Sequence, residues 1–382
     1  MNRLVIENFK SLVDADIRLG KLTVFSGLNG SGKSSALQIF ALLKQSMEST
    51  HNQKNNIKLK LRGPYVNLGR VKDIYCESAN SERISLGLNL KNERVDLNFM
   101  INSEILNKDY LSCEASVEAM NTLRSIFSDF QFIQADRIVP NSQYSQASSE
   151  YRDNNNLGAN GEYSADYLAN NSAKKISSIR SFPHNAIGVS ENLFQQTAPT
   201  DSLIDQVCGW MQHLSPGVKL SAEEITGTDS VRLKYNYTGE SITSEGDDRR
   251  PIHVGFGLTY CLPIIISCLI AKKGSFLLLE NPEAHLHPQG QFAMGILLAK
   301  CASDEVNVLV ETHSDHVLNG IRVATKKELL APDDVAIHYF TRNVNDGSTF
   351  IQSPNILPDG SITNWPDGFF DQWTKSLDIL LG

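Results

Sequence analysis

The sequence lacks several features that would place it in a special class of protein. Its six cysteines, at positions 76, 113, 208, 261, 268 and 301, are scattered and form no CxxC pair, which argues against a disulfide framework and a cysteine zinc site. The longest apolar run, 258–271, contains a proline and is shorter than the ~18 residues of a membrane helix. It predicts a buried core helix, and the start "MNRLVIENFK" predicts a strand rather than a signal peptide. We therefore expect a soluble, cytoplasmic protein without membrane contact.

Positive charge is also in short supply. The chain of 382 residues has 35 Lys and Arg against 43 Asp and Glu, a formal net charge of −8. No general basic field therefore favours the binding of nucleic acid. Internal repeats and sustained heptads are absent from the sequence, which excludes a long coiled coil.

What the sequence does have is a regular alternation of strand and helix patterns. Short alternating stretches within 1–26 predict strands, helical spacing follows to about residue 47, and two alternating stretches around "KNER" within 84–101 predict a β-hairpin. The Asn- and Ser-rich stretch 141–175 predicts a mobile loop, 185–215 a helix and 231–241 a strand. From 251 onward the order is helix, buried strand, helix from about 288 to 302, and buried strand.

The stretch "GLNGSGKSS", 27–35, joins the third strand to the first helix. Its glycines let the backbone wrap with N–H groups pointing inward, and the helix N-terminus favours negative charge. Lys33 is placed to reach β- and γ-phosphates, and Ser34 to hold Mg²⁺. A flexible glycine loop is the plain alternative, but the flanking strand and helix favour a phosphate loop.

A second motif, "FLLLENPEAHLHP", is an apolar strand that ends in Glu280. Such a strand delivers a carboxylate to the ligand-binding edge of a parallel sheet. Glu283, His285 and His287 follow closely. The two histidines are spaced i, i+2 rather than i, i+4, so we expect a loop at a subunit interface rather than a zinc site.

Two further motifs are weaker. The strand in "VLVETHSDH" places His313 where it would touch a γ-phosphate, or where it is only a surface histidine after a capped strand end. The stretch "VGFGLTYCLP" offers N–H groups and the Thr259 hydroxyl at a helix start, and its plain alternative is a turn before a core helix.

Taken in order, these motifs resemble the ABC-type ATPase heads of the SMC and recombination-repair class. Within that class the sequence is most similar to small bacterial ATPases related to the overcoming-lysogenization-defect (OLD) family and to ATPase subunits of anti-phage systems such as Septu. The resemblance covers "LVIENFKSLVDADIRLGKLTVFSGLNGSGKSS", residues 251–322 and the ending "ILPDGSITNWPDGFFDQW". The middle, roughly 50–240, is far less diagnostic.

The resemblance implies a set of site residues and two ligands, ATP and Mg²⁺. Lys33 and Ser34 match the Walker A pair, Glu280 the Walker B magnesium acid, and His313 the switch histidine. The implied catalytic group is Glu280, Asn281, Glu283 and His313. The implied nucleotide-binding group is Asn29, Gly30, Ser31, Gly32, Lys33, Ser34, Ser35, Gly255, Gly257 and Thr259. The signature loop, 255–259, closes on ATP held by a second subunit in the family, so a head-to-tail homodimer with two composite sites, or a higher oligomer, is expected.

Two departures from the family pattern bear on the mechanism. Walker B usually reads Asp-Glu, whereas this chain has Glu280-Asn281. Asn281 cannot accept a proton, so general-base assistance of up to ~10²–10⁴-fold is expected to be missing unless Glu283 supplies it. Tyr260 stands in the signature turn where related sequences often carry Gln.

We therefore predict an α/β, two-lobed ABC-type (P-loop) ATPase head with an N-lobe β-hairpin. The expected divisions are an N-terminal ATPase lobe (1–130), a helical and loop-rich insertion (131–245), a C-terminal ATPase lobe (246–330) and a C-terminal extension (331–382). The expected function is an ATPase, slow in turnover, that controls a separate effector, a nuclease or toxin, in anti-phage defence. The alternatives are a nucleotide-held scaffold with negligible turnover and an SMC-like DNA-repair ATPase, which the net charge and missing coiled coil disfavour.

The ending "NWPDGFFDQW" places four large aromatic residues close together. Exposed aromatics at that density mark an interaction site. The other interpretation, equally supported by the sequence, is a segment packed on the chain's own core.

Overall fold

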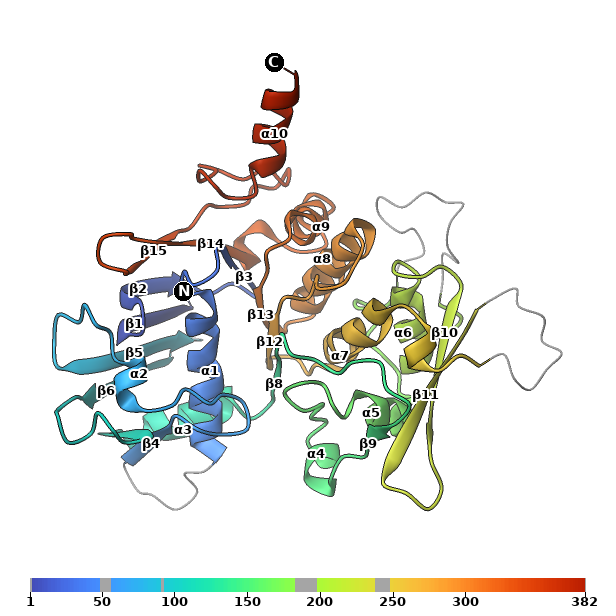
Figure 1. Cartoon of the computed structure of the whole chain (residues 1–382), viewed down its shortest axis with the longest axis horizontal. Helices are drawn as coiled ribbons and strands as arrows, with labels where there is room; N and C mark the ends of the chain where they lie inside the picture. Colours follow the sequence, from blue (N-terminus) through green and yellow to red (C-terminus); the bar gives the residue numbers. More distant parts are fainter. Residues whose placement is uncertain (1, 49–55, 91–92, 183–197, 238–247, 382) are drawn as a thin grey trace. The chain divides into compact units, whose positions relative to one another are not determined.

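The computed structural model describes residues 2–48, 56–90, 93–182, 198–237 and 248–381. They form two compact units that are not consecutive in sequence (Figure 1). The first unit comprises 1–130, 309–313 and 331–382, and the second comprises 131–308 and 314–330. Among the described residues, the helices are too short or too polar to cross a membrane.

The first unit begins with an antiparallel sheet in the order β2-β1-β5-β6. Its strands are β1 (Arg3–Phe9), β2 (Leu12–Arg18), β5 (Arg83–Leu90) and β6 (Glu93–Met100). Buried and exposed residues alternate along β6, so one face of the predicted hairpin is buried, and the hairpin is confirmed. A two-stranded sheet of β4 (Asn56–Lys60) and β7 (Tyr110–Glu114), with the helices α2 (Val71–Ile74) and α3 (Val117–Ile126), belongs to the same unit.

The phosphate loop belongs to another sheet of this unit. The fully buried strand β3 (Leu22–Gly27) precedes the loop, and α1 (Lys33–Glu48) follows it, so the predicted strand–loop–helix is confirmed. After the short 3₁₀ turn Pro332–Asp334, β14 (Val335–Arg342) pairs in parallel with β3, and β15 (Thr349–Gln352) pairs antiparallel with β14. The residues after 330 thus build two strands of the sheet that carries the loop.

The second unit contains the apolar helices that the sequence predicted. The apolar run forms α7 (Phe256–Ile270), preceded by the 3₁₀ turn Pro251–His253, and β12 (Phe276–Glu280) is a buried strand. Next come α8 (Pro288–Ser303), β13 (Asn307–Glu311), whose last residues belong to the first unit, and α9 (Asp315–Lys326). A Cβ at Gly295 on α8 would lie 2.2 Å from the Val317 carbonyl oxygen on α9, so this helix contact requires glycine.

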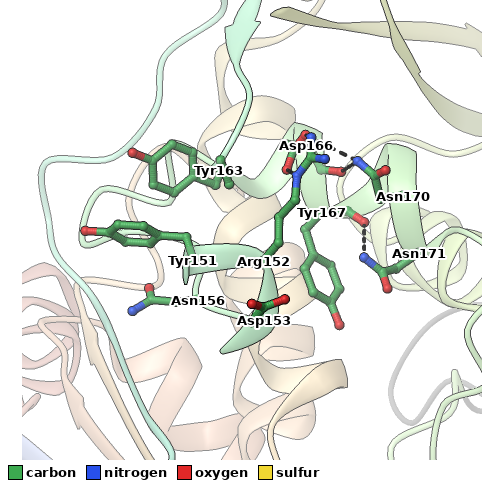
Figure 2. A pocket seen from close by; sticks show the side chains of 10 residues that line it. Tyr151, Arg152, Asp153, Asn156, Tyr163, Asp166, Tyr167, Asn170 and Asn171 are labelled. Carbon is green, nitrogen blue, oxygen red and sulfur yellow. Dashed lines mark hydrogen bonds and ion pairs between the residues drawn. The ribbon is translucent and has the colours of Figure 1, made fainter. Parts of the chain in front are cut away.

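The stretch 141–175 is more ordered than predicted. After β8 (Phe130–Ile133) it contains β9 (Tyr144–Ser145), α4 (Ser149–Asp153) and α5 (Ser164–Asn171), so the prediction of a mobile loop was wrong. An ion pair with the buried Asp166 explains the order, because the exposed Arg152 donates from Nε and Nη2 to the two carboxylate oxygens at 2.9 and 2.5 Å (Figure 2). Paired polar groups therefore fix a segment that has few apolar residues.

The remaining elements of the second unit are α6 (Leu203–Met211), β10 (Val218–Glu224) and β11 (Ser230–Tyr237), with the strand order β10-β11-β9. The strand predicted at 231–241 is confirmed over its described part. The helix predicted at 185–215 begins only at Leu203 among the described residues, and 183–197 and 238–247 lie outside them.

The aromatic residues near the C-terminus differ in burial: some pack against the sheet and others remain exposed. The Phe369 side chain is fully buried, and its ring lies 5.3 Å from that of Tyr339 on β14. The Trp365 indole N–H donates to the Phe369 carbonyl oxygen. Trp373, on α10 (Gln372–Leu381), is 70% exposed. The packing interpretation thus holds for Phe369, whereas Trp373 remains on the surface.

We expect Phe369→Ala to lower the free energy of unfolding by about 3–5 kcal/mol, since it leaves a cavity against β14. Trp373→Ala is the matched control, and we expect a change below about 0.5 kcal/mol because this side chain is exposed. Urea denaturation followed by circular dichroism measures both. Equal losses in the two variants would contradict the packing described for Phe369.

Candidate functional site

The backbone of the phosphate loop depends on its glycines. Gly27 has φ of +141° and Gly32 has φ of +100°, values that side-chain-bearing residues rarely adopt. A Cβ at Gly27 would also lie 2.1 Å from the Phe340 carbonyl oxygen on the neighbouring strand β14. Asn29 and Gly30 are exposed at the tip, whereas Ser34 and Ser35 are half-buried at the start of α1. The loop therefore presents its N–H groups and the N-terminus of α1 to an anion.

A residue near the end of the chain supports this loop from behind. The hydroxyl oxygen of Thr349 on β15 lies 2.9 Å from the Ser31 carbonyl oxygen and 2.8 Å from the Ser11 hydroxyl oxygen. A Cβ at Gly32 would lie 2.6 Å from the same Thr349 oxygen. Sequence reasoning missed Thr349, because the contact joins residues 318 positions apart.

Lys33 is the buried charge of the loop. Its side chain is 3% exposed, and its Nζ donates to the Leu28 carbonyl oxygen at 2.8 Å. Burial lowers the pKa of Lys33, and the Glu311 carboxylate, whose Oε1 lies 3.6 Å from Nζ, opposes that shift. The ammonium therefore stays at the base of the loop, where a phosphate group would lie.

Glu311 is the second residue that sequence reasoning missed. It ends β13, and the next residue, Thr312, donates its backbone N–H to the Phe25 carbonyl oxygen on β3 at 3.0 Å. This pairing places the carboxylate beside Lys33. Burial raises the pKa of Glu311, while hydrogen bonding from Ser34 and the charge of Lys33 oppose the rise. Only the position of Glu311, two residues before the predicted switch histidine, could have signalled it.

His313 belongs to the same unit as the phosphate loop. The pKa of His313 is lowered by partial desolvation and by the positive charge of Lys33. The charge of Lys33 therefore acts on the His313 imidazole. Lys33, Ser34, Glu311 and His313 thus form one group of residues within the first unit.

The Walker B candidates form a separate group in the second unit. Glu280 ends β12, and its Oε2 accepts a hydrogen bond from the Ala135 backbone N–H at 3.0 Å. Asn281 follows with φ of +46°, a conformation that Asn tolerates better than most residues. The Oδ1 atom of Asn281 is buried without a hydrogen-bond partner. Glu283 is half-buried in the loop that follows.

Arg137 holds the backbone of this group. Its guanidinium is buried, and it donates to the carbonyl oxygens of Glu280 at 2.6 Å and Asn281 at 2.8 Å. It also donates to the carbonyl oxygens of Gln134 and Tyr260, both at 3.1 Å. Burial lowers the pKa of Arg137, yet an arginine remains charged at neutral pH. Sequence reasoning missed Arg137, which lies 143 residues before Glu280.

Tyr260 supports the same arrangement. Its ring lies 4.3 Å from the Arg137 guanidinium carbon, and its hydroxyl donates to the Ala135 carbonyl oxygen. The departure from the family's Gln thus has a structural role in this chain, because the phenol binds the segment that contacts Glu280.

The predicted signature turn lies at the start of α7. Gly255 caps the helix, and a Cβ at Gly257 would lie 2.6 Å from the His285 carbonyl oxygen. Thr259 is fully buried, and its hydroxyl oxygen lies 3.3 Å from that of Tyr235, so this hydroxyl is part of the core. The His285 ring packs on Phe256 with a centroid distance of 4.6 Å. His287 caps α8, with Nδ1 3.5 Å from the Gln289 backbone nitrogen.

Comparison with known proteins identifies the family. A family model described as "AAA ATPase domain" matches residues 1–318, more than half of the chain. The chain belongs to this family. The ATPase domain is followed by residues 330–380, which match a model described as "Protein of unknown function (DUF3696)". Family membership identifies the chain as an ATPase, which implies that it binds a nucleotide. No curated protein matches the chain.

Several solved structures are similar to the ATPase at low sequence identity. An SMC head bound to the C-terminal winged-helix domain of ScpA has a TM-score of 0.49 and 16% identity, covering 92% of this chain and 97% of that chain. The SMC head domain from Thermotoga maritima has a TM-score of 0.43 and 14% identity over 92% and 97%. A Pyrococcus furiosus Smc head with an extended coiled coil, bound to the C-terminal domain of ScpA, has a TM-score of 0.49 and 13% identity over 100% and 99%. At these TM-scores the three structures assign no function to this ATPase.

We expect Arg137→Lys to lower the turnover number of the ATPase about 10- to 10²-fold, because an ammonium cannot hold four carbonyl oxygens in place. The KM for ATP should change less than threefold, since the phosphate loop is untouched. Steady-state kinetics on the folded protein measures both parameters.

Arg180 provides the matched control for this substitution. It is equally buried, donates to the carbonyl oxygens of Cys268 and Leu269 at 2.9 and 3.2 Å, and pairs with Asp304. Arg180→Lys should lower the melting temperature and leave the turnover number unchanged. A similar fall in turnover in both variants would reduce Arg137 to a role in stability.

Proposed function

We propose that the chain is an ABC-type ATPase that binds Mg²⁺-ATP, dimerises head to tail, and controls a separate effector, a nuclease or toxin, in bacterial defence against phage. The observation that carries nucleotide binding is the buried Lys33 ammonium at the base of a loop with three glycines at positive φ. The sequence resemblance to OLD-family and Septu-type ATPases supports the defence role.

The residues of the loop suit a triphosphate. The Lys33 ammonium, the loop N–H groups and the N-terminus of α1 supply positive potential. The Ser31 hydroxyl oxygen is buried without a hydrogen-bond partner, and a phosphate oxygen is the kind of group that would pair with it. These donors support ATP rather than an uncharged ligand.

The donor set also suits magnesium. In the resembled class the residues that match Ser34 and Glu280 hold it, and hydroxyl and carboxylate oxygens are the ligands that it prefers. No three His, Cys, Asp or Glu side chains gather as a metal cluster within the described residues. Mg²⁺ at a nucleotide needs no such cluster, because phosphate oxygens and waters complete its coordination. When bound, it would supply charge neutralisation during phosphoryl transfer.

Exposed apolar side chains support assembly. Leu28, in the phosphate loop, is 71% exposed, and Phe256, in the signature turn, is 39% exposed. Each chain carries one phosphate loop and one signature turn, and in the resembled class the two meet across a dimer. Leu28 and Phe256 are the large apolar contacts that such an interface would bury.

The C-terminal helix supports a partner. Several large apolar side chains of α10 are exposed, namely Trp373, Ile379, Leu380 and Leu381. A separate effector would cover them, because exposed clusters of this kind favour protein–protein contact.

A second candidate function rests on Asn281. This residue stands where a catalytic carboxylate is expected, and its amide cannot accept a proton. A nucleotide-held scaffold, in which ATP clamps the dimer with negligible turnover, would retain the phosphate loop and lack the base.

We expect Lys33→Ala to weaken ATP binding at least about 10²-fold, the effect of losing ~3 kcal/mol from a charged hydrogen bond. Dimerisation induced by Mg²⁺ and a non-hydrolysable ATP analogue should disappear with it. Lys44→Ala is the control, since Lys44 lies on the same helix and bonds to the Phe127 carbonyl oxygen. Calorimetry and light scattering report the two effects. Unchanged ATP affinity in Lys33→Ala would exclude the nucleotide-site assignment, and a protein that is monomeric throughout would exclude the dimer.

Turnover of the wild-type ATPase should lie below ~1 s⁻¹, the lower end of typical enzymes, because Asn281 supplies no base. Asn281→Glu should raise turnover at least about tenfold. Asn281→Asp should do so with less strain, since Asp tolerates a positive φ. Glu283→Gln should change the rate little. If Glu283→Gln stops hydrolysis and neither change at 281 raises it, Glu283 is the base and the slow-turnover proposal fails.

A further inference from the structure

The Glu311 carboxylate is an unusual neighbour for a phosphate-binding lysine. Glu311 is 5% exposed, and its Oε1 lies 3.6 Å from Lys33 Nζ. It therefore places a negative charge at the point where the N-terminus of α1 and the loop would receive negatively charged phosphates. A second anion there competes with the phosphates for Lys33 and repels them, most strongly where water is excluded.

The two oxygens of this carboxylate differ. Oε1 faces the Lys33 ammonium, whereas Oε2 is buried without a hydrogen-bond partner. A buried carboxylate oxygen without a donor costs free energy. An ion pair kept only for stability would be expected to have a cation near each oxygen.

A buried carboxylate of the second unit, Asp304, offers a comparison, although its Oδ1 is also buried without a hydrogen-bond partner. Asp304 is also almost fully buried, yet its Oδ2 lies 2.8 Å from Arg180 Nε and its Oδ1 lies 3.2 Å from Lys273 Nζ. Each oxygen thus has its own cation. Glu311 has a cation on one side only, which leaves its other oxygen available to a cation that arrives with a ligand.

We propose that Glu311 makes the phosphate loop selective for nucleotide complexed with a divalent cation over metal-free nucleotide. Without nucleotide, the carboxylate pairs with Lys33 and accepts from Ser34. When Lys33 turns to the phosphates, the carboxylate needs another positive partner, and the cation or its bound water supplies one at Oε2. This inference rests on the proposed function, because it concerns the same nucleotide site.

The test compares binding of a non-hydrolysable ATP analogue in EDTA with binding in excess Mg²⁺, by calorimetry on the full chain. Wild type should bind the Mg²⁺ complex at least tenfold more tightly than the metal-free analogue. In Glu311→Gln the affinity for the metal-free analogue should rise at least tenfold, because the competing charge is gone. Affinity for the Mg²⁺ complex should change less than threefold or fall, so the preference collapses.

Asp304→Asn is the matched control, because it neutralises a buried, ion-paired carboxylate in the other unit. It should leave both affinities unchanged, and melting temperatures show that each variant is folded. If Glu311→Gln does not fold, Glu311→Ser, which leaves room for water beside Lys33, replaces it in the same titrations and should give the same collapse of the preference.

The outcomes separate this inference from the proposed function. If wild type binds neither form of the analogue, the proposed function fails, and the inference with it. If wild type binds both forms equally, or if the substitution at 311 shifts both affinities by the same factor or shifts neither, the inference alone is overturned. Glu311 is then a structural partner of Lys33.

Discussion

The buried ammonium of Lys33 is the constraint on which the first unit depends. A charge removed from water must find partners, or the fold loses several kcal/mol. The Leu28 carbonyl oxygen is one partner, and the conformation of the loop brings it within hydrogen-bonding distance of the Lys33 Nζ atom. Glu311 is the other, and it requires β13 to end beside β3. The loop conformation and the order of these strands are therefore linked through one side chain.

The second unit buries two arginines in different ways. Arg180 has a carboxylate partner, Asp304, in addition to backbone carbonyls. Arg137 donates to four carbonyl oxygens, and the ring of Tyr260 covers it. Carbonyl dipoles balance the charge without consuming a carboxylate. Glu280 can thus lie next to a buried cation and keep its own side chain bonded to the Ala135 N–H.

The sequence predicted the local features of this molecule better than the long-range ones. The phosphate loop, the hairpin and the buried strands follow from periodicity and glycine spacing within short segments, and the structure contains them. Thr349, Glu311 and Arg137 could not be found in this way, because each acts on residues more than a hundred positions away. Apart from the position of Glu311 two residues before His313, nothing near these residues distinguishes them from ordinary strand or loop positions.

The prediction of a mobile loop for the stretch 141–175 was wrong for a related reason. Its many Asn and Ser residues resemble those of a disordered segment, but the ion pair between Arg152 and Asp166, together with buried Leu157 and Leu168, orders it. Composition alone does not show which polar residues will find partners. The roles predicted for Glu280, Asn281, Glu283 and His313 in catalysis stay predictions, since they depend on a nucleotide and a second chain.

Two residues of the proposed site, one amide and one carboxylate, favour a slow nucleotide-dependent switch over a rapidly turning-over enzyme. The chain has an amide at 281, where the resembled class has a base, and a carboxylate at 311, beside Lys33. On the proposed function, the first would slow departure from the ATP-bound state, because water would not be activated. The second would disfavour entry of nucleotide without its metal, because like charges would meet in a buried site. On the proposed function, the first feature would lengthen the lifetime of the dimer closed on Mg²⁺-ATP, and the second would make its formation depend on the metal. An effector would be held in this dimer until a trigger opens it.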